Sequence, residues 1–176
     1  MFSLGSNECG QLGIGDDTLP DDWTFEPQKV NLTLIKQVSC GGDFSICVTD
    51  RGDVYSFGNN ENGTLGLDGL DEYVSSPKKI EILKDVDFIE CGGDYAICKT
   101  LNNEIYAWGS NEYHQFGFFD EVSGEEKNIV LGYVSPVKCL NWPDNIVNIK
   151  CGASHTLILT SNQEVYYSGV LTLENK

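Results

Sequence analysis

Two pairs of cysteines are the residues of this chain whose spacing most invites a chemical role. Cys40 and Cys47 lie seven residues apart, and Cys91 and Cys98 repeat this spacing in a matching segment. Cysteine thiolates bind zinc, but strong zinc signatures carry a tighter Cys-x-x-Cys spacing, which this sequence lacks. In the third copy of the segment, Ile158 occupies the place of Cys47 and Cys98. A place filled by either Cys or Ile is typical of a small buried apolar position, so the sequence predicts no metal site.

The two histidines do not complete a catalytic group either. His155 follows a Gly-Ala-Ser segment and is expected to pack and form hydrogen bonds, and His114 lies in a turn, where His tolerates a left-handed backbone. No Ser-His-Asp or Cys-His arrangement can be assembled around them. The Gly41-Gly42 and Gly92-Gly93 pairs lack the lysine and the helix of a phosphate-binding loop. The sequence thus favours a non-catalytic protein without a cofactor and leaves enzymatic activity open.

The elements that must position these residues recur along the chain. A strand that runs into a glycine-rich turn occurs three times, and a fourth copy starts but breaks off after its glycine. The register glycines, at intervals of 53, 51 and 60 residues, are Gly5, Gly58, Gly109 and Gly169. A second motif repeats three times in the same phase, and its cysteine is Cys40, Cys91 or Cys151. Two motifs that keep one phase indicate a repeat architecture with a period near fifty residues.

The sequence of each unit predicts about four short β-strands bounded by turns. No long segment shows the three-and-four spacing of apolar residues that is typical of a helix. Four-stranded antiparallel units of this period suit a β-propeller. We therefore predict an all-β fold, an incomplete (open) β-propeller of about three four-stranded antiparallel blades. Residues 1–176 form a single repeat domain with units 5–57, 58–108 and 109–169, a stray blade strand at 2–4 and a tail at 170–176.

One strand of each unit is expected to begin near or after a proline. These strands are predicted at Val30–Ile35, Lys79–Leu83 and Val137–Leu140. The segment Asp16–Pro27, which precedes the first of them, is predicted to be an acidic loop.

The charge balance narrows the class of partner. The chain has 11 basic and 27 acidic residues, and its formal net charge is −16. Nucleic acids and anionic membranes are bound by basic surfaces, so neither is expected as the main partner, whereas a basic protein is compatible. No secretory leader is recognisable, so the seven cysteines are expected to be thiols and the protein to be cytoplasmic, with a nuclear location left open.

The repeated motifs resemble those of the regulator of chromosome condensation repeat family. Tyr106-Ala107-Trp108-Gly109-Ser110-Asn111, Gly10-Gln11-Leu12-Gly13 and Gly152-Ala153-Ser154-His155-Thr156 carry the resemblance, which covers residues 2 to 169. The resemblance implies blades of a seven-bladed propeller, of which this chain holds about half. Members of the family include a nucleotide-exchange factor for a Ran-type GTPase and many proteins that use the propeller to bind partners. Fold alone does not carry the exchange activity, because function depends on the loops.

Two non-repeating segments, 16–26 and 118–132, are the candidate partner-binding loops. They combine acidic residues with large apolar ones, and the candidate contact residues are Trp23, Phe25, Phe118 and Phe119. Loops on a rigid scaffold often bind partners, and aromatic residues often anchor interfaces. The leading prediction is a protein-interaction module whose partner is a small GTPase, another protein or another domain of the same protein. The alternative is a guanine nucleotide exchange factor for a Ran-type or Rho-type GTPase, or a regulatory domain of one.

An open arc of blades leaves strand edges and sheet faces uncovered at both ends. We therefore also expect these ends to be covered either by another chain or by sequence not present here, and self-association through the ends is one form of the first alternative.

Overall fold

The computed structural model describes residues 1–15, 23–67, 72–116, 132–139 and 142–170. These residues form thirteen β-strands, which are β1 (Phe2–Ser6), β2 (Trp23–Lys29), β3 (Ile35–Cys40), β4 (Phe44–Thr49), β5 (Val54–Asn59), β6 (Tyr73–Lys79), β7 (Val86–Cys91), β8 (Tyr95–Thr100), β9 (Ile105–Ser110), β10 (Gly132–Lys138), β11 (Ile146–Cys151), β12 (His155–Thr160) and β13 (Val165–Gly169). The described part of the chain contains no helix, and hence none long and apolar enough to cross a membrane.

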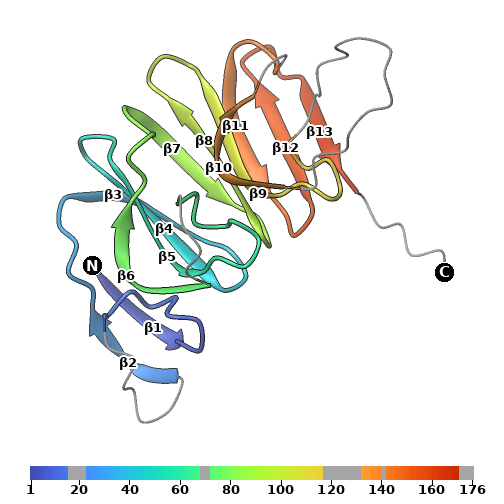
Figure 1. Ribbon diagram of the computed structural model, residues 1–176. Helices are drawn as coiled ribbons and strands as arrows, with labels where there is room; N and C mark the ends of the chain where they lie inside the picture. The colour runs from blue at the N-terminus through green and yellow to red at the C-terminus, as the bar shows by residue number, and fades with distance from the viewer. Residues whose placement is uncertain (16–22, 68–71, 117–131, 140–141, 171–176) are drawn as a thin grey trace.

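The strands form four antiparallel sheets that follow one another around an arc (Figure 1). We call them blade 0 (β1 and β2), blade 1 (β3 to β6), blade 2 (β7 to β10) and blade 3 (β11 to β13). Blades 1 and 2 have four strands each in chain order, while the described residues supply three strands to blade 3 and two to blade 0. The predicted all-β, open propeller with four-stranded antiparallel blades is confirmed.

The outermost strands begin earlier than predicted. The segment Trp23–Lys29 is strand β2 and not a loop. Strands β6 and β10 likewise begin several residues before the predicted strands at 79–83 and 137–140 and overlap only their first residues. Pro27, Pro77 and Pro136 therefore lie inside these strands, each within an irregularity of the pairing. An edge strand tolerates proline because an N–H that points to solvent or lies in a bulge is not needed by the ladder. The prediction that proline lies before the outermost strand of each unit was therefore wrong, because the proline lies inside that strand.

The core lies between blades 1, 2 and 3, because neighbouring sheets bury the faces that they turn toward each other, and blade 2 is covered on both faces. On β4, Phe44, Ile46 and Val48 point to blade 2 and are at most 2% exposed. They share one apolar cluster with Ile89 of β7 and Trp108 of β9. A second cluster joins blades 2 and 3, with Tyr95, Ile97, Ile149 and Ile158 among its buried members. Burial on both faces explains why β4 and β8 are apolar with small residues interspersed, rather than strictly alternating.

The cysteines follow this arrangement. Cys47, Cys98 and Ile158 are 1% exposed or less, which confirms the predicted small apolar position. Cys91 at the end of β7 is also buried, whereas its equivalent Cys40 at the end of β3 is exposed. The two differ because blade 1 covers Cys91, while blade 0 has no described inner strands to cover Cys40. All seven cysteines are free.

Candidate functional site

The glycine-rich turns gather at one end of the blades, which we call the turn end. Gly58 and Gly109 mark where β5 and β9 approach these turns, and both have positive φ, +113° and +90°. A Cβ at either position would overlap the backbone of the preceding hairpin, at the carbonyl oxygen of Asp43 or Asp94. Only glycine allows this close approach, which holds each turn beside the hairpin loop of the same blade.

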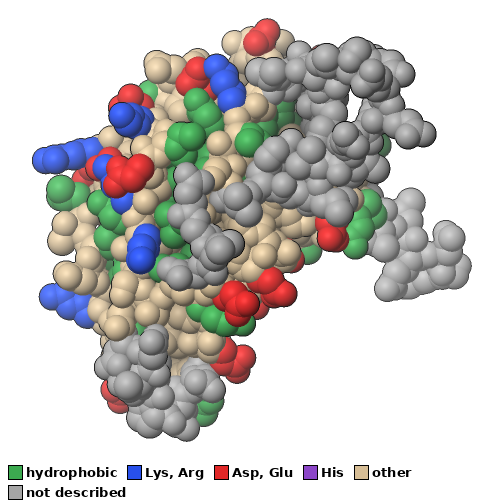
Figure 2. All heavy atoms as spheres, in the orientation of Figure 1, with side chains coloured by type: hydrophobic (Ala, Val, Ile, Leu, Met, Phe, Trp, Pro, Cys, Tyr) green, Lys and Arg blue, Asp and Glu red, His purple; other side chains and the backbone are tan. Residues whose placement is uncertain are grey.

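Five acidic residues recur at the turn end. Glu8, Glu61 and Glu112 lie in the three glycine-rich turns, and Asp43 and Asp94 lie in the adjoining hairpin loops. All five are exposed. Burial raises the pKa of the nearby Cys9 thiol, and the negative charges of Asp43, Glu8 and Glu61 raise it further. Figure 2 shows acidic side chains at the lower right, where the strands of Figure 1 reach this end.

Trp23 and Phe25 lie on strand β2, which corrects their assignment to a loop. Trp23 is opposite Ser6, at the turn end of blade 0. The two rings meet edge to face, with centroids 4.4 Å apart, and the side chains are 47% and 80% exposed. The positional equivalents on β6 are Tyr73 and Ser75. The other two candidates, Phe118 and Phe119, lie outside the described residues.

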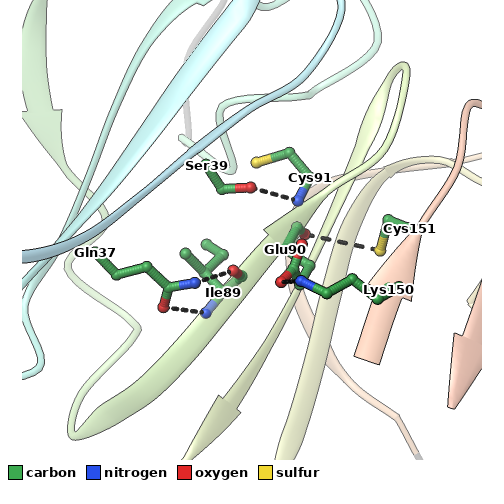
Figure 3. A network of polar contacts seen from close by, with 7 residues as sticks. All are labelled: Gln37, Ser39, Ile89, Glu90, Cys91, Lys150 and Cys151. Carbon is green, nitrogen blue, oxygen red and sulfur yellow. Dashed lines mark hydrogen bonds and ion pairs between the residues drawn. The ribbon is translucent and has the colours of Figure 1, made fainter. Parts of the chain in front are cut away.

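Two polar side chains of β3 bind the backbone edge of β7 (Figure 3). The Gln37 amide donates to the carbonyl of Ile89 at 2.7 Å and accepts from its N–H at 3.0 Å. The Ser39 hydroxyl accepts from the N–H of Cys91 at 3.0 Å. These side chains pair with backbone N–H and C=O groups on the edge of β7 that faces away from β8, where its sheet has no further strand. Sequence reasoning missed both, because Phe88 and Glu90 hold the equivalent places in the next unit and no repeat signal marks them.

The interface between blades 2 and 3 uses other contacts. Lys150 of β11 forms an ion pair with Glu90 of β7, and the Cys151 thiol points to the Glu90 carbonyl at 3.9 Å (Figure 3). The Tyr95 hydroxyl donates to the carbonyl of His155 at 2.5 Å. The two interfaces share one backbone hydrogen bond, from the Gly42 N–H to the Gly93 carbonyl and from the Gly93 N–H to the Ala153 carbonyl, but their side-chain polar contacts differ.

Both histidines occupy structural positions of the repeat. The His155 ring lies over Gly152 where a Cβ would overlap it, as the Phe44 ring lies over Gly41. His114 has φ of +59° in the turn place held by Gly10 and Gly63 in the earlier units.

The face of blade 3 that points away from blade 2 is apolar, and no described residue covers it. Its exposed members are Leu157 at 41%, Leu159 at 38%, Val165 at 66% and Tyr167 at 64%. Their equivalents in blade 1 are at most 2% exposed because blade 2 covers them. Such a face is a surface for a further blade or a partner.

The described residues contain no group of three or more His, Cys, Asp or Glu side chains that could hold a metal ion. Burial is the first cause of the raised pKa of the thiols of Cys9, Cys47, Cys91 and Cys139. A thiol with a raised pKa is a poor nucleophile at neutral pH. The surfaces at the turn end and at the ends of the arc are therefore the stronger candidates for function.

Comparison with known proteins identifies the repeat. The family described as the regulator of chromosome condensation (RCC1) repeat matches residues 1–48, 51–98 and 102–159. The serine/threonine-protein kinase Nek9 of Mus musculus is 33% identical over 173 residues, which cover 94% of this chain and 16% of that protein. The E3 ubiquitin-protein ligase HERC2 of Homo sapiens is 30% identical over 96% of this chain and 3% of its own length. Protein RCC2 of Mus musculus is 28% identical over 96% of this chain and 36% of its own length.

Solved structures show the same blades. Prp20p from Saccharomyces cerevisiae, described with its binding to Gsp1p and histones, superposes with a TM-score of 0.80 at 25% identity, over 98% of this chain and 40% of that one. Human WBSCR16 superposes with a TM-score of 0.77 at 24% identity, over 96% of this chain and 42% of that one. The chain thus spans less than half the length of each of these relatives. It belongs to the regulator of chromosome condensation (RCC1) repeat family.

Proposed function

We propose that this chain is a non-catalytic protein-interaction module, which binds a basic protein partner at the turn end of its blades. The observation that carries the proposal is the exposed Trp23–Phe25 pair beside a row of exposed carboxylates. Aromatic anchors supply apolar contact area, and surrounding charges select a partner of opposite sign. The net charge of −16 strengthens the attraction to a basic surface at low ionic strength. The partner is a separate protein, such as a small GTPase, or another domain of a longer protein.

We expect alanine at Trp23 or Phe25 to weaken partner retention while the melting temperature stays nearly unchanged, because both side chains are exposed on an edge strand. The measurement is quantitative pull-down, with proteins retained by the wild-type chain compared between variants. Tyr73→Ala is the matched control, since Tyr73 holds the equivalent position on β6 and is 55% exposed. Equal retention by all three variants, or a large loss of stability in Trp23→Ala, contradicts the proposed role.

A second candidate function is guanine nucleotide exchange on a small GTPase. Its support is the likeness to Prp20p, whose structure is described together with its binding to Gsp1p. The rate of release of a fluorescent nucleotide from Ran, Rho and Rab GTPases distinguishes the two candidates. The interaction module is expected to leave every release rate unchanged, and acceleration of any of them by this chain contradicts the non-catalytic proposal.

A further inference from the structure

The outermost strand of blade 1 carries a serine in a sequence that protein kinases recognise. Strand β6 contains Ser76-Pro77-Lys78-Lys79. Proline-directed serine/threonine kinases require proline directly after the acceptor serine, because they offer no partner there for a backbone N–H, which proline lacks. One class of these kinases also selects a basic residue three positions after the serine, and binds it through negatively charged groups. Pro77 and Lys79 meet both requirements relative to Ser76.

Ser76 lies where β6 departs from regular pairing with β5. The register shifts between Ser56 and Gly58 of β5, and residues 75–77 of β6 lie opposite the one residue between them. Strand β6 is also the last strand of its sheet in the described part of the chain. A bulged segment on an edge strand opens locally without unfolding of the sheet. The segment can therefore enter the active site of a kinase as an extended chain.

The Ser76 side chain is exposed and borders an open pocket. The pocket has a volume of about 550 Å³ and lies between β6 and the first glycine-rich turn, and its lining includes Gly13, Gly15, Ser76 and Pro77. A Cβ at Gly15 would lie 2.9 Å from the Ser76 Oγ. Glycine at this position thus keeps the space beside the hydroxyl open, and the pocket has room for a phosphate group.

The lysine that such a kinase selects is accessible as well. The Lys79 Nζ lies 2.7 Å from an Asp53 carboxylate oxygen, and the two side chains are 33% and 34% exposed. Ion pairs at a protein surface are weak, because water solvates both charges once they separate. Lys79 can therefore exchange Asp53 for an acidic group of a kinase.

The equivalent place in blade 0 already carries a negative charge. Glu26 of β2 directly precedes Pro27, as Ser76 precedes a proline in β6, and the pairing of both strands shifts there. Glu26 is exposed, and β2 keeps its pairs with β1 on both sides of it. An acidic group at this place is thus compatible with a paired outer strand, as a phosphoserine requires.

We propose that Ser76 is a phosphorylation site of a proline-directed serine/threonine kinase that selects lysine three positions after the serine. The Ser76 Oγ attacks the γ-phosphorus of magnesium-bound ATP, a new Oγ–P bond forms, and the bond from this phosphorus to the β,γ-bridging oxygen breaks, so that ADP leaves. The hydroxyl proton passes to the carboxylate base of the kinase. The product carries about −1.5 to −2 additional charges at pH 7, beside the first glycine-rich turn. The proposal does not depend on the partner proposed for the turn end.

Ser135 of β10 has the same sequence signature in a more enclosed setting. It precedes Pro136, and Lys138 follows three positions after it. Ser135 is half-buried and Pro136 is buried, whereas Ser76 is exposed and Pro77 is half-buried. We therefore expect a kinase to modify Ser76 faster than Ser135, because a buried proline must first leave its packing.

The test incubates the folded whole chain with a purified cyclin-dependent kinase, magnesium and ATP. Phosphate incorporation is followed over time, and mass spectrometry of proteolytic fragments locates it. A synthetic peptide with the sequence of residues 72–82 serves as the unfolded reference. We expect phosphate at Ser76 of the folded chain, at a rate within about tenfold of that of the peptide, because only an edge segment has to open.

Four variants test the recognition. Ser76→Ala should abolish this modification, and Ser75→Ala, which changes the neighbouring serine that no proline follows, should leave it unchanged. Lys79→Gln should slow it about tenfold or more, because the charged contact with the kinase is lost. Lys138→Gln is the matched control, since it removes the equivalent ion pair, with Glu104 in blade 2, and should leave the rate at Ser76 unchanged.

Three outcomes overturn the proposal. The first is the absence of phosphate at Ser76 in the folded chain, and the second is an equal rate for the wild-type chain and Lys79→Gln. The third is faster modification of Ser135 than of Ser76 in the folded chain. Ser76→Glu adds a measurement without a kinase, because its melting temperature should stay close to that of the wild-type chain, and a large decrease contradicts the compatibility of this place with a negative charge.

Discussion

Replacing Trp108 with alanine is expected to lower the free energy of unfolding by about 3–5 kcal/mol, because it empties the largest buried position between blades 1 and 2. The indole is 0% exposed, and its Nε1 donates to the Thr64 carbonyl at 2.9 Å. It also packs against Gly66 in the glycine-rich turn between β5 and β6 of blade 1. Loss of the ring therefore loosens a turn as well as the core. Chemical denaturation monitored by circular dichroism measures the change.

Trp108→Phe separates packing from the hydrogen bond, since it keeps most of the ring and leaves the Thr64 carbonyl unpaired. The expected loss is smaller, about 1–3 kcal/mol. Tyr167→Ala is the surface control, because Tyr167 is 64% exposed on β13, and its loss should be within about 0.5 kcal/mol. A loss below about 1 kcal/mol for Trp108→Ala contradicts the described packing of blades 1 and 2.

Replacing Gly109 with alanine is expected to lower the free energy of unfolding by about 3 kcal/mol or more. Two costs combine there, because φ is +90° and the new Cβ would overlap the Asp94 carbonyl and lie 2.8 Å from the Tyr95 Cα. The overlapping atoms belong to the backbone, so no side-chain rotation relieves the contact. Thermal and chemical unfolding of the variant measure the combined effect.

Gly5→Ala is the matched variant for this prediction. Gly5 holds the same place in the repeat and has a similar φ of +112°, but a Cβ there meets no atom within 4 Å. Its cost is the backbone strain alone, about 1 kcal/mol. The difference between the two variants therefore isolates the close approach of the turn to the hairpin, and equal losses would show that this approach contributes nothing.

The strands that the two repeated motifs specify could be predicted from the sequence, while the outermost strands could not. Strand β4 runs over 44–49 as expected, since a short apolar segment bounded by turn residues is typical of a buried strand. Pro77 misled the prediction of β6, because proline disfavours a central strand but not a bulged edge strand. Whether a strand is central or at an edge depends on its neighbours in space, and the local sequence does not contain this information.

The candidate binding surface, too, could be predicted only in part from the sequence. The types of Trp23 and Phe25 pointed to an interface, but their place on β2 beside Ser6 came from the pairing with β1. The sequence alone determined the repeat, its phase, the all-β class and the buried cysteine position, because these depend on residue type at a fixed period. Only the tertiary structure decided that Gln37 binds the edge of β7 and that Val38 is exposed while its equivalents Ile89 and Ile149 are buried. Both depend on which blade lies across the interface, and equivalent residues of a repeat have different neighbours at its middle and at its ends.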